Sequence, residues 1–158
     1  MTKVLIKKRI VKYGLELFLI VMITLFIFSN SLASYDQSHH TSDSVSQIIL
    51  PNEYSDNEDV LLIVRKIAHL IEYALLGIAV TVLLKCIEKD FQRKIYSVVL
   101  FYTLFVAVLD EHIQSFSDRT SSTADILLDF AGAMIGMVLV FLAVGLFRFF
   151  KRAKKRQQ

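Results

Sequence analysis

Hydrophobic residues fall in long blocks along this chain, and shorter polar segments separate the blocks. Four blocks stand out, at about residues 13–32, 67–87, 95–116 and 126–147. Each is close to the length of about 20 residues that a helix needs to cross the hydrocarbon core of a bilayer. The pattern predicts an all-α integral membrane protein with four transmembrane helices in a compact bundle.

The third block is the shortest, because it is apolar only over residues 95–109. A helix of that length rises roughly 22 Å, which is less than the ~30 Å of the hydrocarbon core. The stretch "DEHIQSFSDR" follows directly. We therefore expect the helix to continue through Asp110, Glu111 and Gln114 to about Phe116.

Basic residues predict the direction of the spans. Of the 18 Lys and Arg residues, 15 lie before the first block, around the connection between the second and third blocks, or at the end of the chain. With four spans these 15 share one side, so the positive-inside rule places both termini in the cytoplasm and the loop at 33–59 outside. The 15 are Lys3, Lys7, Lys8, Arg9, Lys12, Lys85, Lys89, Arg93, Lys94, Arg148, Lys151, Arg152, Lys154, Lys155 and Arg156.

The first block has a second interpretation. Its basic start and the small residues of "SNSLAS" also fit a secretory signal peptide cleaved after Ala33, which would leave three spans. We favour a retained helix, because the apolar stretch is long for a signal peptide. In the outer loop, "SDNE" at residues 55–58 has the form of a capping box and predicts that the second helix begins near Asp56.

Polar residues inside the spans gather at one depth, toward the extracytoplasmic side. A charge at the centre of a bilayer costs at least ~2.5–3.5 kcal/mol, so these residues should face one another and not lipid. Spacings of three and four residues put the members from each helix on one face. They are Arg65, Lys66, His69, Glu72 and Tyr73 in the second span, Asp110, Glu111 and Gln114 in the third, Arg119 in the turn, and Asp125 and Asp129 in the fourth.

These residues suggest a binding site that also has acid–base capacity. We expect Arg65, Lys66 and Arg119 to hold an anionic head group. The same binding site would include Tyr73, Glu111, Gln114 and Asp125. Acid–base chemistry or hydrogen bonding would come from His69, Glu72, Asp110 and Asp129. In the structural alternative, the charges pair between helices and only stabilise the bundle.

Other kinds of site have less support in the sequence. No H-E-x-x-H motif, paired E-x-x-H motif or cysteine set is present, so we predict neither a metal nor another cofactor, although His69 and the nearby acids have ligand chemistry. No G-x-S-x-G elbow suggests a serine hydrolase, and Ser122 with Asp125 is interpreted as a helix cap. The single Cys86 excludes an internal disulfide. We interpret the basic C-terminal segment as an anchor at the inner leaflet and predict no binding of nucleic acid.

The stretch "GAMIG" forms a G-x-x-x-G motif from Gly132 to Gly136 in the fourth span. Such a motif lets another helix backbone approach closely. We expect it to serve packing within the chain, with a homodimer through the same two glycines as the alternative.

Four short stretches follow one another along the chain: "SNS" after the first span, "RKIAHLIEYALLG" at the second, "DEHIQSFSDR" closing the third and "DILLDFAGAMIG" opening the fourth. In these pieces the chain resembles the VanZ-like family of bacterial integral membrane proteins. The resemblance implies a single membrane domain over residues 1–158, located in the bacterial cell membrane, with its polar motif facing outward. Some members are associated with resistance to teicoplanin, a glycopeptide that binds cell-wall precursors.

We therefore expect a cell-envelope protein that binds or processes an outer-leaflet component, such as a lipid-linked wall precursor, and affects susceptibility to glycopeptides. The second span departs from resistance-associated members, which tend to lack its R-K-x-x-H-x-x-E-Y stretch. One alternative is a small transporter coupled to ions or protons, which would need a polar path to the cytoplasmic side. Another is a non-catalytic membrane assembly factor.

Overall fold

The computed structural model describes residues 2–32, 58–91, 96–116 and 122–156. They form four helices, α1 (Thr2–Leu32), α3 (Glu58–Phe91), α4 (Tyr96–Gln114) and α5 (Thr123–Arg156). All four are long and apolar enough to cross a membrane. The prediction of an all-α membrane protein with four spans is confirmed.

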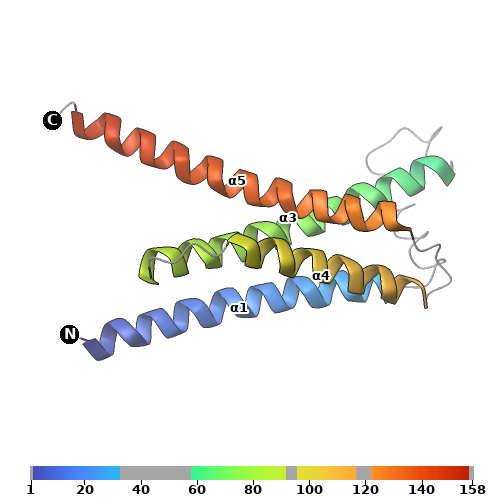
Figure 1. The fold of residues 1–158 in the computed structure, drawn as a ribbon, viewed down its shortest axis with the longest axis horizontal. Helices are drawn as coiled ribbons and strands as arrows, with labels where there is room; N and C mark the ends of the chain where they lie inside the picture. Colours follow the sequence, from blue (N-terminus) through green and yellow to red (C-terminus); the bar gives the residue numbers. More distant parts are fainter. Residues whose placement is uncertain (1, 33–57, 92–95, 117–121, 157–158) are drawn as a thin grey trace.

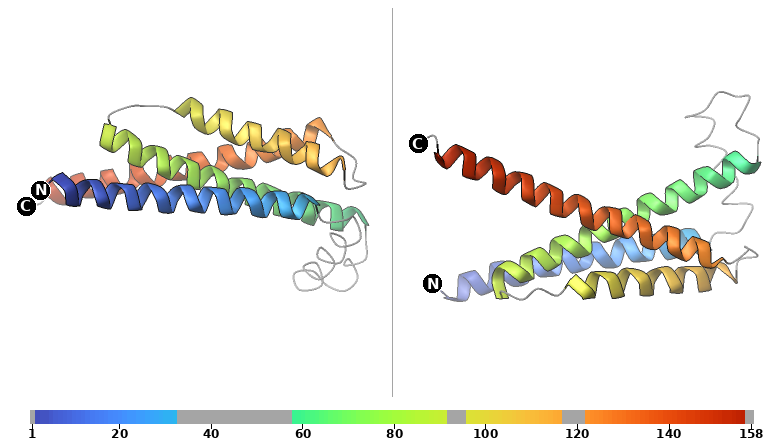
Figure 2. Two further views of the ribbon diagram at one scale, coloured as in Figure 1. Left: turned by 90° about the horizontal axis from the view of Figure 1, so that it is seen from below. Right: turned by 45° about the horizontal axis from the view of Figure 1, so that its top comes forward.

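Helices α3 and α5 cross at the centre of the bundle, and their contact is the most extensive between any two helices (Figure 1). Helix α3 also contacts α1 and α4, so it packs against every other helix. The start of α1 and the end of α5 lie at the same end of the bundle in all three views (Figures 1 and 2). Consecutive helices therefore run in opposite directions, as four successive spans require.

Glycines allow α3 and α5 to approach closely at their crossing. A Cβ atom at Gly132 would lie 2.5 Å from the backbone oxygen of Leu70, and one at Gly136 would meet the backbone oxygen of Ala74. Gly77 makes the corresponding close approach from α3 to α5. The expected role of "GAMIG" in packing within the chain is confirmed, whereas a homodimer through these glycines stays a prediction.

The core is small, and most of the outer surface is apolar. Ile27 of α1, Tyr73 and Leu76 of α3 and Ala107 of α4 are fully buried. On the outside, large apolar side chains such as Phe101, which is 74% exposed, follow one another along the helices. Such an extensive apolar surface is unfavourable in water and fits the hydrocarbon core of a membrane.

Polar contacts also join the helices at the end of the bundle that holds the termini. The Tyr13 hydroxyl donates a hydrogen bond to Asp90, linking α1 to α3. The Lys85 ammonium lies 4.8 Å from the ring centre of Tyr96 and 4.5 Å from that of Phe141. Because these rings belong to α4 and α5, one lysine of α3 contacts both neighbouring helices.

The end of α4 differs slightly from the sequence prediction. Helix α4 continues through Asp110 and Glu111 but ends at Gln114 instead of about Phe116. A turn follows, in which the Ser115 N–H donates to the Glu111 carbonyl at 3.1 Å. The predictions for Arg119, for the signal-peptide site and for a helix start near Asp56 lie outside the described residues, which include only Glu58 of the capping box at 55–58.

Candidate functional site

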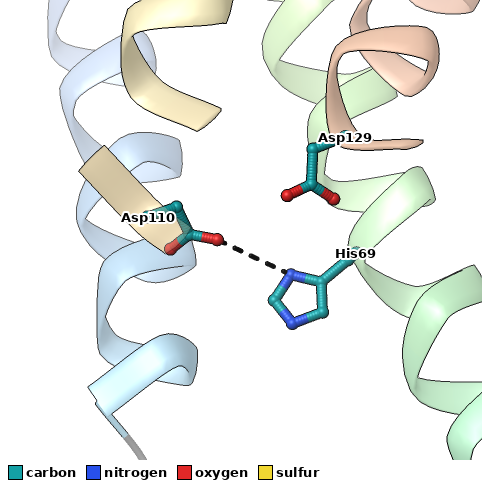
Figure 3. A group of neighbouring side chains, drawn as sticks. All are labelled: His69, Asp110 and Asp129. Atoms are coloured by element: carbon teal, nitrogen blue, oxygen red, sulfur yellow. Dashed lines mark ion pairs between the residues drawn. The ribbon is translucent and has the colours of Figure 1, made fainter. Parts of the chain in front are cut away.

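The polar residues of three helices meet at the end of the bundle opposite the termini. His69 of α3, Asp110 of α4 and Asp129 of α5 each bring one potential ligand atom to within 4.8 Å of the others. Figure 3 shows the three side chains pointing toward one another from separate helices. The convergence expected from the helical spacing is thus present for these three residues.

The imidazole of His69 lies between two carboxylates. Its Nδ1 atom is 3.7 Å from Glu72 Oε2 and 4.0 Å from Asp110 Oδ2. The His69 side chain is 13% exposed, whereas Asp110 is fully buried and Asp129 is 3% exposed. A histidine held beside buried carboxylates has the groups needed to accept and return a proton.

Helix α1 contributes to the site through two residues that the sequence analysis did not count among its members. The Asn30 amide donates a hydrogen bond of 2.7 Å to Glu72 Oε1. The Gln114 amide donates to Asp110 Oδ2 at 3.0 Å and to Ser31 Oγ at 3.4 Å. The available signal was the position of "SNS" at the C-terminal end of the first span, at the same end of the bundle as the other polar residues.

Glu111 forms a hydrogen bond at the start of α5. Its Oε1 atom accepts a hydrogen bond from the backbone N–H of Ser122, and the Ser122 hydroxyl accepts one of 3.2 Å from the backbone N–H of Ala124. Ser122 therefore caps α5 as expected. The predicted partner Asp125 is not part of the cap, because Asp125 pairs with Lys66 at 2.6 Å. By holding the start of α5, Glu111 helps to position Asp129, which lies in the first two turns of that helix.

A cavity of about 20 Å³ opens beside this cluster of polar residues from α3, α4 and α5. That volume accommodates about one water molecule, so a larger ligand would contact the rim and place one small group inside. The Lys66 side chain is 40% exposed, which makes its ammonium group reachable from outside. The lining residues are Arg65, Lys66, His69, Gln114, Asp125, Leu128 and Asp129.

Acids outnumber bases at the site among the described residues. Neither Asp110 nor Asp129 forms an ion pair with a lysine or arginine in the described part of the chain. Among the described residues, several buried polar atoms there also have no hydrogen-bond partner, including Asp110 Oδ1 and Glu111 Oε2. Since buried polar groups are normally paired, these atoms give the site unused capacity to bind a ligand.

The structure brings most of the predicted site residues together. Six of them line the cavity: Arg65, Lys66, His69, Gln114, Asp125 and Asp129. Glu72, Tyr73 and Asp110 lie next to these residues on α3 and α4, and Glu111 bonds to Ser122 at the start of α5. The catalytic and binding roles expected for all of them stay predictions.

Comparison with models of known protein families identifies the family of this chain. A family model described as VanZ/LLP1 matches residues 16–147, which include the whole polar cluster and the crossing of α3 and α5. Comparisons with curated proteins and with solved structures gave no match. The match covers most of the sequence, so the chain belongs to the VanZ/LLP1 family.

Proposed function

We propose that the protein acts at the cell envelope and binds the phosphate-bearing head group of an outer-leaflet component, such as a lipid-linked wall precursor. The observation that carries the proposal is the polar cavity near one end of a bundle with an extensively apolar outer surface. Two basic side chains, Arg65 and Lys66, line that cavity. A head group can reach them while its lipid chain stays in the membrane.

The charge distribution supports an extracytoplasmic site. Most basic residues outside the cluster belong to the start of α1, the end of α3 and the end of α5. These helix ends lie at the end of the bundle that holds the termini (Figure 1), whereas Asp110 is near the end of α4 and Asp129 near the start of α5. Under the positive-inside rule the basic ends face the cytoplasm, and the cavity then faces the outer leaflet.

The basic side chains are suited to phosphate. The Lys66 ammonium is held by Asp125 at 2.6 Å, and the Lys66 side chain is 40% exposed. The ammonium group has further donors for an incoming oxygen. Arg65 can add a forked pair of N–H donors, which matches the spacing of phosphate oxygens. A charged head group would thus find both a positioned ammonium and a guanidinium at the rim.

An apolar stripe on α3 supports the lipid part of the proposal. Ile63, Ile67 and Ile71 follow one another at four-residue spacing and are 54%, 52% and 53% exposed. The middle residue of the stripe adjoins Lys66 in the sequence. A lipid chain lying along this face would bring its head group to the cavity.

Processing of the bound head group would use His69. Its Nδ1 atom lies near Glu72 and Asp110, and Asn30 and Gln114 hold these two carboxylates in place. A positioned imidazole–carboxylate pair can transfer a proton to or from a leaving oxygen. In the proposal these groups do the acid–base work, and Arg65 and Lys66 bind the substrate.

The transporter alternative has weaker support in the described residues. It needs ionisable or polar groups through the interior of the bundle. Among the described residues, the fully buried polar side chains outside the site are Thr81 and Thr103, and the Thr103 hydroxyl donates to Val99 of its own helix at 2.8 Å. An assembly factor without a ligand is the remaining alternative, and it predicts that changes in the cluster alter stability alone.

A binding experiment tests the proposal. The purified protein in detergent is titrated with a long-chain isoprenyl pyrophosphate and with the isoprenyl alcohol of the same length, and affinity is measured by calorimetry. We expect binding of the pyrophosphate only, and binding weakened about tenfold to a hundredfold in Lys66→Ala, since a charge-assisted hydrogen bond contributes about 1.5–3 kcal/mol.

Lys89→Ala is the matched control, because Lys89 is an exposed lysine at the other end of the same helix. It should bind as the parent does. Equal binding of the alcohol and the pyrophosphate, or an equal loss in both lysine variants, would contradict the proposal. In cells, Lys66→Ala should also change teicoplanin susceptibility to the level of cells without the protein.

A further inference from the structure

We infer that His69, Asp110 and Asp129 form a binding site for a transition-metal dication, Zn²⁺ or Mn²⁺. One potential ligand atom from each residue lies within 4.8 Å of the other two. The three residues come from α3, α4 and α5 and point into the space between these helices (Figure 3). The proposed site is thus built from three helices and not from one local run of acids.

The distances are close to those of a loaded site. In a tetrahedral site, two ligands that each lie about 2.1 Å from one ion are roughly 3.4 Å apart. The observed limit of 4.8 Å means that the side chains need to approach one another by at most about 1.4 Å. Side-chain rotation achieves such a shift without moving a helix.

The burial and pairing of Asp110 provide an independent argument. Asp110 is fully buried, and within the described residues no hydrogen bond reaches its Oδ1 atom. Its other oxygen accepts a hydrogen bond of 3.0 Å from Gln114, and Ser31 and Tyr73 also interact with this carboxylate. Asp129 is also 3% exposed, and within the described residues no lysine or arginine pairs with either carboxylate. Two buried carboxylates without a lysine or arginine partner are costly in a membrane, and a dication would offset that cost.

The ligand types indicate the class of ion. Imidazole nitrogen suits Zn²⁺ and related metals, whereas carboxylate oxygen also suits Mn²⁺. Three protein ligands leave coordination positions free, as in catalytic and not structural zinc sites. Gln114 holds Asp110 through a hydrogen bond of 3.0 Å, which is the kind of support that fixes the orientation of a metal ligand.

A bound dication would also change the charge of the cavity. Acids exceed bases there, which by itself disfavours a phosphate group. An ion held by His69, Asp110 and Asp129 would compensate the excess and offer a free position to a phosphate oxygen. This last consequence rests on the proposed function, whereas the metal site does not.

Metal binding is measured on untagged protein purified with a chelator and then titrated with Zn²⁺ or Mn²⁺ in detergent. We expect about one tightly bound ion per chain and an affinity lowered at least about tenfold in Asp129→Asn and in His69→Gln. Co²⁺ bound to the parent should give a visible absorption spectrum that both variants lose. If Asp129→Asn fails to fold, His69→Gln provides the same test.

A control separates the site from adventitious binding. His112→Ala removes an exposed histidine near the end of α4. This variant should keep the affinity of the parent. Absence of a bound ion in the parent, or equal affinity in parent, His69→Gln and Asp129→Asn, would overturn the inference.

The same preparation distinguishes the two proposals. Titration with isoprenyl pyrophosphate is repeated after removal of metal by the chelator. Metal binding without any preference for the pyrophosphate over the alcohol would leave the metal site standing and contradict the proposed function. Preferential binding of the pyrophosphate by a parent protein that takes up no metal would support the proposed function and overturn the metal site.

Discussion

Asn30 is the side chain through which α1 reaches the polar cluster, since its amide donates a hydrogen bond of 2.7 Å to Glu72. We expect Asn30→Ala to lower the stability of the protein by about 1 kcal/mol, within the range of interhelical hydrogen bonds in membranes. For a chain of this size that corresponds to a decrease in Tm of roughly 2–4 °C. Thermal unfolding in detergent measures it.

Ser29→Ala is the control, because Ser29 is the exposed neighbour of Asn30 on the same helix. Its Tm should equal that of the parent. A Tm for Asn30→Ala that also equals that of the parent would show that the contact with Glu72 contributes nothing to stability.

At the level of single residues, the sequence predicted which side chains share a face but not which partners they meet. The stripe of Arg65, His69 and Glu72 follows from helical spacing alone. The bond from Ser122 to Glu111 joins two helices through a backbone N–H, and no periodicity reveals such a contact. Ser31 was missed for a related reason, since a serine at the end of a span is common whether or not it meets another helix.

At the level of helices, the crossing of α3 and α5 depends on small residues. A Cβ at Gly136 would meet the backbone oxygen of Ala74, and a backbone atom cannot turn aside as a side chain can. We expect Gly136→Ala to destabilise the protein by about 1–3 kcal/mol, as overpacking of a well-packed core does. The measurement is the shift in Tm, together with the yield of monodisperse protein.

Gly145→Ala makes the same substitution on the same helix where a new Cβ would touch nothing within 4 Å. There we expect an unchanged or slightly raised Tm, because alanine favours helix formation over glycine by about 1 kcal/mol. If both variants unfolded at the same temperature, the close approach of α3 and α5 would not limit stability.

The hydrophobic blocks predicted that four helices exist, but the ends of the helices were less predictable. Helices α3 and α5 each contain 34 residues. A helix of that length rises about 51 Å, well beyond the ~30 Å hydrocarbon core. Hydropathy reports the part of a helix that contacts lipid, whereas the remaining turns depend on polar residues and on packing. The crossing angle likewise depends on where Gly132 and Gly136 meet α3.

For the whole molecule, the decisive property is the side of the membrane that the cluster faces. Both termini lie at one end of the bundle (Figure 1), and the cluster lies toward the other, since Asp110 is near the end of α4 and Asp129 near the start of α5. The basic residues near the termini predict that this end is cytoplasmic. Labelling of single cysteines tests that prediction after the free Cys86 has been replaced by alanine. Thr123→Cys and Lys151→Cys place one exposed thiol at each end of α5.

With a membrane-impermeant maleimide, we expect Thr123→Cys to be labelled in intact cells and Lys151→Cys only after the membrane is permeabilised. The two variants control each other, because they share one helix and differ only in the end they mark. The reverse pattern would place the cavity on the cytoplasmic side, where an outer-leaflet lipid cannot reach Arg65 and Lys66. The metal site would survive that result, since the geometry of His69, Asp110 and Asp129 does not depend on which leaflet lies nearby.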